Sequence, residues 1–303
     1  MREDGPPAPG AIRLEARAKL NLVLEVVGRR PDGYHEIRSV IAPLDLADTV
    51  TVERLEEPAG SLELEVDPPG VVGEADNLAL RAARLMRDAA GVPDAGARIR
   101  IAKRIPVAAG LGGGSTDAAA VLLALNRLWG LGWPAERLQA LGARLGADVP
   151  ACLRGVLGET VLAEGVGERV TTLPPAPRLH VVLATPEATW PGPKTRTVYA
   201  AYRPPGIGAR AEQAVAALRR GDTAGLLAAV ANDLEPGAAA LVPAIRHLRE
   251  AFLSAGAPVV AMAGAGPTVF ALAPDPALAE RLAAAARPLA RAIHVTATGD
   301  VLP

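Results

Sequence analysis

This chain of 303 residues has one cysteine, only 3% aromatic residues and almost no net charge. Its one cysteine, Cys152, excludes an intramolecular disulfide, so we expect a buried, inert thiol in a reducing compartment. The formal net charge is −1, which gives no overall attraction for nucleic acid or for an anionic membrane. No apolar run reaches the roughly 18 residues that span a bilayer, and the first ten residues lack the apolar stretch of a signal peptide. A cytoplasmic location is the expectation.

The length allows about two domains. Alternating apolar residues predict strands at 12–27, 37–53, 61–66, 97–106, 180–185 and 292–297, and two short strands around the glycines at 264 and 266. Helical spacing predicts helices at 77–90, 115–129, 134–145, 276–288 and, in several pieces, 209–255. Glycines and a proline pair between 155 and 177 indicate a domain junction. We therefore predict an α+β fold with one domain at 1–160 and a second at 161–303.

The strongest chemical signal is the glycine-rich segment that follows Pro106. Four glycines in five positions let successive backbone N–H groups converge on an anion, and Ser115 is expected to cap a buried helix whose N-terminus favours negative charge. The alternative is a plain glycine-rich turn. No lysine follows the glycines, so the segment is not a P-loop, and a serine replaces the third glycine of a dinucleotide fold. The residues expected to form this phosphate site are Pro106, Gly110, Leu111, Gly112, Gly113, Gly114, Ser115 and Thr116.

Three segments together resemble the motifs of the GHMP kinases, the superfamily of galacto-, homoserine, mevalonate and phosphomevalonate kinases. They are AKLNL (18–22), PVAAGLGGGSTDAA (106–119) and AMAGAGPTVF (261–270). The segment GRRPDGYHE (28–36) is similar to one branch of that family, which phosphorylates a polyol linked to cytidine diphosphate. Further matches to this branch follow in order along the chain, at DNLALRAA (76–83), LGADVP (145–150), EGVGE (164–168) and NDLEP (232–236).

The resemblance implies a two-domain GHMP kinase fold with the active site in the cleft between the domains. It also implies ATP and Mg²⁺ as cofactors, and a small-molecule substrate whose 2-hydroxyl receives the γ-phosphoryl group in the non-mevalonate route to isoprenoids. No obligate protein partner is evident. Two alternatives stay open: another alcohol as acceptor, such as homoserine or a mevalonate derivative, and a sensor that binds nucleotide without turnover. The family usually has serines at Ala263 and Ala265, so only backbone amides near Gly264 and Gly266 can serve in the third motif.

By resemblance, Lys19 and Asp148 are the catalytic residues. Lys19 would polarise the acceptor hydroxyl, and Asp148 would take or orient its proton. The alternative for Lys19 is an outward-facing position on an edge strand, and the alternative for Asp148 is a turn or helix cap. The presence of both residues argues against the sensor.

The resemblance also implies the residues that bind the substrate. Tyr34 and His35 would offer cytosine a ring and hydrogen-bond partners, with Tyr199 as the second aromatic wall, and Asn21 and Thr195 complete this group. Tyr34 could instead close a turn, and Tyr199 could be a core aromatic.

Two further positions, Asn77 and Asp117, each have two competing interpretations. By resemblance Asn77 lies near the adenine, although its place before a helix is equally typical of an N-cap. Asp117, in the first turns of the buried helix, must point away from the phosphates or meet Mg²⁺. The magnesium ligand stays unknown, with Asp117 as one candidate.

Overall fold

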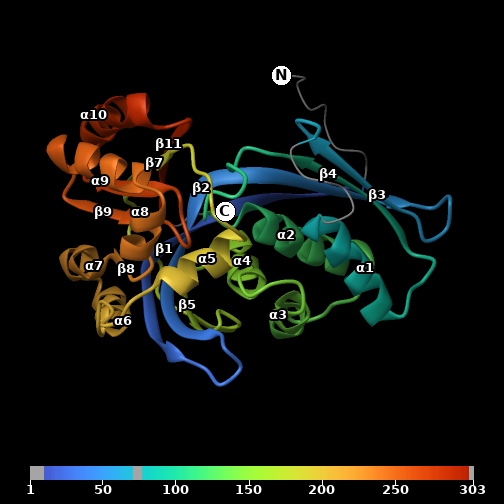
Figure 1. Cartoon of the computed structure of the whole chain (residues 1–303). Helices are drawn as coiled ribbons and strands as arrows, with labels where there is room; N and C mark the ends of the chain where they lie inside the picture. The colour runs from blue at the N-terminus through green and yellow to red at the C-terminus, as the bar shows by residue number, and fades with distance from the viewer. Residues whose placement is uncertain (1–9, 71–76, 300–303) are drawn as a thin grey trace. The chain divides into compact units, whose positions relative to one another are not determined.

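The computed structural model describes residues 10–70 and 77–299, which fold into two compact units (Figure 1). Of the described residues, the first unit comprises 10–18, 47–70, 77–107 and 112–157, and the second comprises 19–46, 108–111 and 158–299. Two long strands, β1 (Ile12–Arg29) and β2 (His35–Leu55), contribute residues to both units. The predicted α+β class is confirmed. The predicted domains, 1–160 and 161–303, differ from the compact units mainly in the assignment of residues 19–46.

The first unit packs helices on one face of a sheet. Besides parts of β1 and β2, its elements are β3 (Leu62–Asp67), α1 (Leu78–Ala90), β4 (Gly96–Ala102), α2 (Gly113–Leu128), α3 (Ala135–Ala143) and α4 (Val149–Val156). Strand β4 pairs antiparallel with β2 and parallel with β3, with Ile99 opposite Val52 and Leu64. Every residue of α2 from Thr116 to Leu125 is buried, as its apolar sequence predicts. Cys152 of α4 is buried in the same core.

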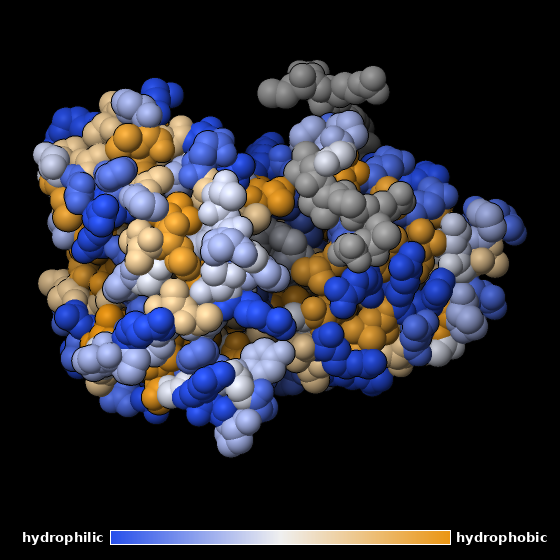
Figure 2. Space-filling model, viewed as in Figure 1, coloured by the Kyte–Doolittle hydropathy of each residue, from blue (hydrophilic) through white to orange (hydrophobic). Residues whose placement is uncertain are grey.

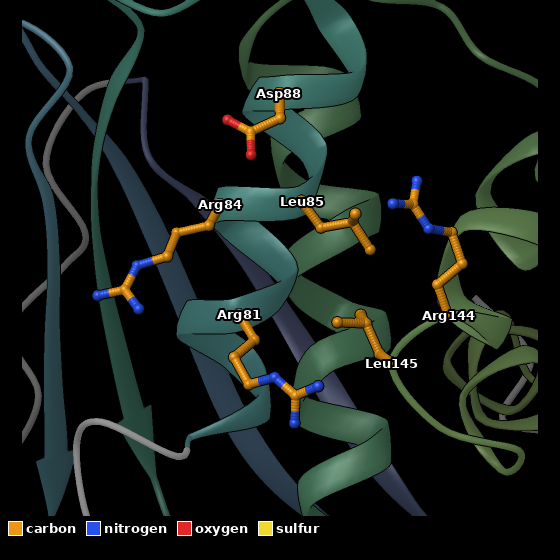
Figure 3. Close-up of a pocket in the computed structure, with 6 residues that line it drawn as sticks. All are labelled: Arg81, Arg84, Leu85, Asp88, Arg144 and Leu145. Carbon is orange, nitrogen blue, oxygen red and sulfur yellow. The ribbon is translucent and has the colours of Figure 1, made fainter.

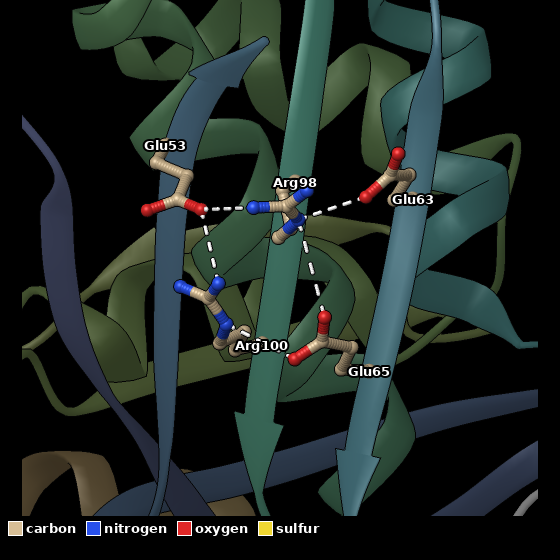
Figure 4. Close-up of polar contacts among 5 residues, drawn as sticks. All are labelled: Glu53, Glu63, Glu65, Arg98 and Arg100. Atoms are coloured by element: carbon tan, nitrogen blue, oxygen red, sulfur yellow. Dashed lines mark hydrogen bonds and ion pairs between the residues drawn. The ribbon is translucent and has the colours of Figure 1, made fainter.

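The opposite face of this sheet carries a ladder of alternating charges (Figure 4). Arg98 pairs with Glu53 at 3.0 Å and with Glu63 at 2.8 Å, and Arg100 pairs with Glu53 at 3.1 Å and with Glu65 at 3.0 Å. The two arginines alternate along β4 with buried residues, so the charges and the core lie on opposite faces. Opposite charges on neighbouring strands stabilise the register of β2, β4 and β3.

The second unit contains an antiparallel sheet in the order β11-β7-β10-β9. Among its described residues it also contains three strands that widen the sheet formed by β1 and β2. Its strands are β5 (Val161–Gly165), β6 (Arg169–Thr172), β7 (His180–Thr185), β8 (Ala231–Asn232), β9 (Val259–Met262), β10 (Val269–Ala273) and β11 (Ala292–Ala297). Strand β5 pairs with β2 and with β6, and β8 pairs with β1. The segment predicted as a junction thus contains β5 and β6, which are too short to give a clear alternation.

The helices of the second unit are α5 (Lys194–Ala201), α6 (Arg210–Arg220), α7 (Thr223–Ala229), α8 (Glu235–Leu241), α9 (Ala244–Ser254), α10 (Pro276–Ala286) and the 3₁₀ turn η1 (Arg287–Leu289). Of these helices, α9 and α10 pack against the antiparallel sheet. Phe252 of α9 and Leu282 of α10 pack with Val269 of β10 in this core. On the visible face of the molecule, hydrophilic side chains are interspersed with hydrophobic ones (Figure 2). Within residues 10–70 and 77–299, no helix has the length and apolar character needed to cross a membrane.

Candidate active site

The glycine segment leads directly into α2, which begins at Gly113. Gly112 is the N-cap residue, and its φ of 73° lies in the left-handed region that favours glycine. Ser115 therefore lies inside the first turn, and no side chain caps the helix, so the prediction of Ser115 as the cap is wrong. The first backbone N–H groups of a helix have no acceptor within it, and the helix dipole is positive there. The start of α2 can thus bind an anion.

Thr116 differs from the glycines before it. Its backbone N–H donates to the carbonyl oxygen of Gly112 at 2.9 Å, and its side chain is fully buried. Gly114, in contrast, is exposed, while Gly112, Gly113 and Ser115 are half-buried. The surface at the start of α2 is therefore formed by residues 112–115, with Thr116 behind them.

A buried cluster of three charged side chains lies behind this first turn. Nζ of Lys103 is 2.5 Å from Oδ2 of Asp48 and 2.7 Å from Oδ2 of Asp117. A Cβ atom on Gly113 would lie 3.3 Å from the same Nζ. The carboxylate of Asp117 thus points toward Lys103, which was one of the two arrangements expected from the sequence. In the described part of the chain, no group of three His, Cys, Asp or Glu side chains could hold a metal ion.

The residues just before the helix, Ala108–Leu111, belong to the second unit and pack against the third motif. Gly110 has a φ of 88°, and a Cβ atom on it would lie only 2.2 Å from the carbonyl oxygen of Ala263. The backbone N–H of Lys19 donates to the carbonyl oxygen of Leu111 at 3.0 Å. Gly110 is therefore a glycine because two backbone segments approach each other closely.

Asn232 holds the third motif in place, although it was not predicted as a site residue. Its Nδ2 donates to the carbonyl oxygens of Met262 and Gly264, at 2.7 and 2.8 Å. The backbone N–H of Gly266 closes a turn by donating to Ala263 at 2.8 Å. The only signal in the sequence was the NDLEP match, which marks a resemblance and says nothing of the partners of this asparagine.

Lys194 is a second residue that sequence reasoning missed. Its Nζ donates to the carbonyl oxygens of Gly266 at 2.7 Å and Ala108 at 2.9 Å. It therefore links the third motif to the segment that leads into the glycine loop. A lysine at the start of α5 is typical of a solvated surface, so its sequence position gave no signal.

Lys19 is buried inside β1, with 5% of its surface exposed, so the alternative of an outward-facing residue is wrong. Its Nζ donates to Oδ1 of Asn21 at 2.7 Å, and Nδ2 of Asn21 donates to Oγ of Ser39 at 2.7 Å. A Cβ atom on Gly264 would lie 3.2 Å from Nζ of Lys19 and 3.3 Å from Oδ1 of Asn21. The structure thus brings Lys19, Asn21 and the third motif together.

Asp148 is the N-cap residue of α4 and is half-buried. Its backbone carbonyl accepts from the N–H of Cys152 at 2.9 Å, whereas its carboxylate makes no capping hydrogen bond. Its position therefore matches the cap alternative, but the backbone rather than the carboxylate starts the helix. Its catalytic role stays a prediction.

Two of the residues expected to bind a base, His35 and Tyr199, are in direct contact. The expected sandwich of the base between Tyr34 and Tyr199 stays a prediction. The rings of His35 and Tyr199 stack at 5.1 Å between centroids, and Tyr202, which was not predicted, meets His35 edge-on at 6.0 Å. The first spacing is that of direct contact, so these two rings enclose no gap. Tyr34 is 67% exposed. Burial lowers the pKa of His35, and the charge of Arg29 lowers it further, which favours a neutral imidazole.

The remaining predicted residues are Asn77, Pro106 and Thr195. Oδ1 of Asn77 accepts from the backbone N–H of Ala79 at 2.9 Å, which confirms that Asn77 caps α1. Its position near an adenine stays a prediction. A Cβ on Gly114 would be 3.7 Å from Leu78, the first residue of α1. Pro106 is half-buried before the glycine segment, and Thr195 is exposed in the first turn of α5.

A pocket of about 280 Å³ lies beside α1 and the end of α3 (Figure 3). It is lined by Arg81, Arg84, Leu85, Asp88, Arg144 and Leu145. The side chain of Arg84 points away from the two leucines, whereas Arg81 and Arg144 extend toward them. None of the predicted site residues lines this pocket.

Comparison with known proteins agrees with the motifs. The family model of the GHMP kinases N terminal domain matches residues 77–156, and that of the GHMP kinases C terminal matches residues 214–288. These two matches cover the glycine segment, α2 and α4, and most helices of the second unit. The chain belongs to the GHMP kinases, as the resemblance predicted.

Individual relatives show which members of the family the chain is most similar to among those compared. A curated 4-diphosphocytidyl-2-C-methyl-D-erythritol kinase of Symbiobacterium thermophilum is 46% identical over 291 residues, which cover 95% of this chain and 99% of the relative. A crystal structure of 4-(cytidine 5'-diphospho)-2C-methyl-D-erythritol kinase has 39% identity and a TM-score of 0.77, covering 95% of this chain and all of that one. Homoserine kinase from Cytophaga hutchinsonii has a TM-score of 0.74 at 17% identity, covering 97% of both chains, and shows the fold alone.

Proposed function

We propose that the chain is an ATP-dependent 4-diphosphocytidyl-2-C-methyl-D-erythritol kinase. It transfers the γ-phosphoryl group of ATP to the 2-hydroxyl of the cytidine-diphosphate-linked polyol, in the cytoplasm. The relative at 46% identity supports this acceptor over homoserine or a mevalonate derivative. The observation that carries the proposal is the buried ammonium of Lys19, held by Asn21 against the glycines of the third motif. A buried lysine in contact with glycine-rich backbone suits a phosphoryl group in transfer.

The start of α2 would bind the triphosphate through its backbone N–H groups. Phosphoryl transfer has a loose transition state, so catalysis is mostly positioning and charge stabilisation. Lys19 would stabilise the charge that develops on the transferred group, and Asp148 would accept the proton of the hydroxyl. The buried hydrogen bonds from Lys19 to Asn21 and on to Ser39 keep the ammonium oriented before the substrate arrives.

Magnesium would enter with ATP. Mg²⁺ is commonly held by substrate phosphates and one or two carboxylates, and keeps several of its waters. Asp48 and Asp117 are both buried and both hydrogen-bond Lys103, so the proposal assigns neither of them to the metal. In this proposal the phosphates of ATP would hold the metal, which would neutralise part of their charge.

A coupled assay of ADP release tests the acceptor directly. With the cytidine-diphosphate polyol, turnover should exceed that with homoserine or mevalonate at least 100-fold, because only this acceptor offers a base to the aromatic residues. Equal turnover with another alcohol would reassign the acceptor. ATP binding without turnover on any of them would favour the sensor.

Tyr34→Ala should raise the KM for the polyol about 5- to 150-fold, because stacking on a base contributes about 1–3 kcal/mol. The KM for ATP should hardly change. Since Tyr34 is mostly exposed, the melting temperature should stay the same. Tyr199→Ala tests the second wall, but this ring packs on the core, so its KM effect must be read beside its melting temperature. If neither variant alters the KM for the polyol, these rings do not bind the base.

A further inference from the structure

Asp117 is the less well satisfied of the two carboxylates that share Lys103. Asp48 accepts from Lys103 through Oδ2 and from the backbone N–H groups of Arg104 and Ile105 through Oδ1, at 2.5 and 2.8 Å. Asp117 accepts only from Lys103, and its buried Oδ1 has no hydrogen-bond partner among the described residues. A buried oxygen without a donor destabilises the ionised carboxylate. If the cluster takes up a proton, Asp117 is therefore the residue that binds it.

The surroundings of Asp117 hold few other charges. Among the described residues, the charged groups that face it are Lys103 and Asp48. The helices packed on α2, namely α1, α3 and α4, bury apolar side chains such as Met86, Leu138 and Val149. Burial raises the pKa of Asp117 to about 7, with Lys103 acting against this shift and Asp48 adding to it. The cluster has a net charge of −1 when both carboxylates are ionised and is neutral when Asp117 is protonated.

The cluster lies behind the first turn of α2, where its charge acts on an anion bound at the start of the helix. Asp117 is four residues after Gly113, so the two share one face of α2. Nζ of Lys103 is 3.3 Å from the place that a Cβ on Gly113 would take. A net negative charge directly behind the first turn opposes a triphosphate at its front, and a neutral cluster does not.

We propose that Asp117 is a positioning residue that couples ATP binding at the start of α2 to the uptake of one proton. The proton comes from solvent and binds the carboxylate of Asp117. This inference rests on the proposed binding of ATP by the glycine segment. In linkage terms, the bound triphosphate raises the pKa of Asp117, so affinity is highest at low pH and falls as pH rises through neutrality.

Titration calorimetry with a non-hydrolysable ATP analogue tests the coupling. Binding is measured at pH 6, 7 and 8, each in two buffers of different ionisation enthalpy, for the wild type and for Asp117→Asn. The asparagine keeps an oxygen for Lys103 but cannot titrate, and protons bound by the nucleotide itself cancel between the two proteins. The wild type should take up about half a proton more than the variant at pH 7. Its Kd should rise about five- to tenfold more between pH 6 and 8, if binding raises the pKa by one to two units.

Equal proton uptake by the two proteins would overturn the inference and leave the proposed function intact. A wild type that does not bind the analogue at any pH would refute the proposed function as well. If Asp117→Asn does not fold, the carboxyl ¹³C signal of Asp117 in the wild type replaces the comparison. Its titration midpoint should move to higher pH when the analogue is bound, and an unchanged midpoint would overturn the coupling.

Discussion

Asp148→Asn is expected to lower kcat about 10²–10⁴-fold, because that is the usual contribution of a general base. Asparagine keeps the shape of the side chain and removes its charge and its ability to accept a proton. It is also as good as aspartate at a helix N-cap, the position of Asp148 before α4, so the fold should be retained. The KM values for ATP and the polyol should change much less than kcat. Steady-state rates with both substrates saturating measure the effect.

Asp222→Asn is the matched control for this substitution. Asp222 is the N-cap residue of α7, and its carboxylate accepts from the backbone N–H of Gly225 at 2.8 Å. Asparagine can accept the same bond, so kcat should be unchanged. A normal kcat in Asp148→Asn as well would remove Asp148 from the mechanism.

Lys19→Met is expected to be similarly severe, since it removes the buried ammonium that Asn21 orients. If Lys19 and Asp148 act as one unit, the double variant should be far less impaired than the product of the two single effects. A simple product of the two effects would mean that they act independently.

The sequence predicted α2 as a buried helix but placed its start two residues too late. The apolar residues from Ala118 onward fix the helix, because they must face a core on all sides. Its first residue depends on the backbone angle of Gly112, which takes a left-handed φ that glycine permits but does not require. Serine is often found at N-cap positions, but here the loop places Gly112 at the N-cap and Ser115 inside the first turn.

The sequence also located Lys19 without showing its environment. A lysine between apolar residues is compatible with an exposed or a buried position, and resemblance alone favoured the buried one. The buried position of Lys19 depends on one hydrogen bond to Asn21 and on the approach of Gly264, which is 245 positions away along the chain. Asn232 was missed for the same reason, since its partners, two backbone carbonyls of the third motif, cannot be read from side-chain patterns.

Gly110→Ala should cause the largest loss of stability of any single methyl group added to the glycine segment. Its φ of 88° disfavours a residue with a Cβ by about 1–2 kcal/mol. The new methyl would also lie 2.2 Å from the carbonyl oxygen of Ala263 and 2.9 Å from that of Gly266. Overpacking of this kind costs about 1–3 kcal/mol, and backbone atoms cannot rotate away. We expect the melting temperature to fall by about 5–15 °C and the KM for ATP to rise.

Two alanine substitutions separate these causes. Gly158 has a φ of 84° and no atom within 4 Å of its Cβ position, so Gly158→Ala measures the cost of the backbone angle alone. A Cβ on Gly114 would be 3.7 Å from Leu78, an ordinary contact, and alanine is favoured over glycine in a helix by about 1 kcal/mol. Gly114→Ala should therefore leave the melting temperature unchanged or raise it. If Gly110→Ala loses no more stability than Gly158→Ala, the backbone of the third motif does not approach Gly110 as closely as described. A larger loss would show that contact with Ala263, in addition to the backbone angle, requires glycine at this position.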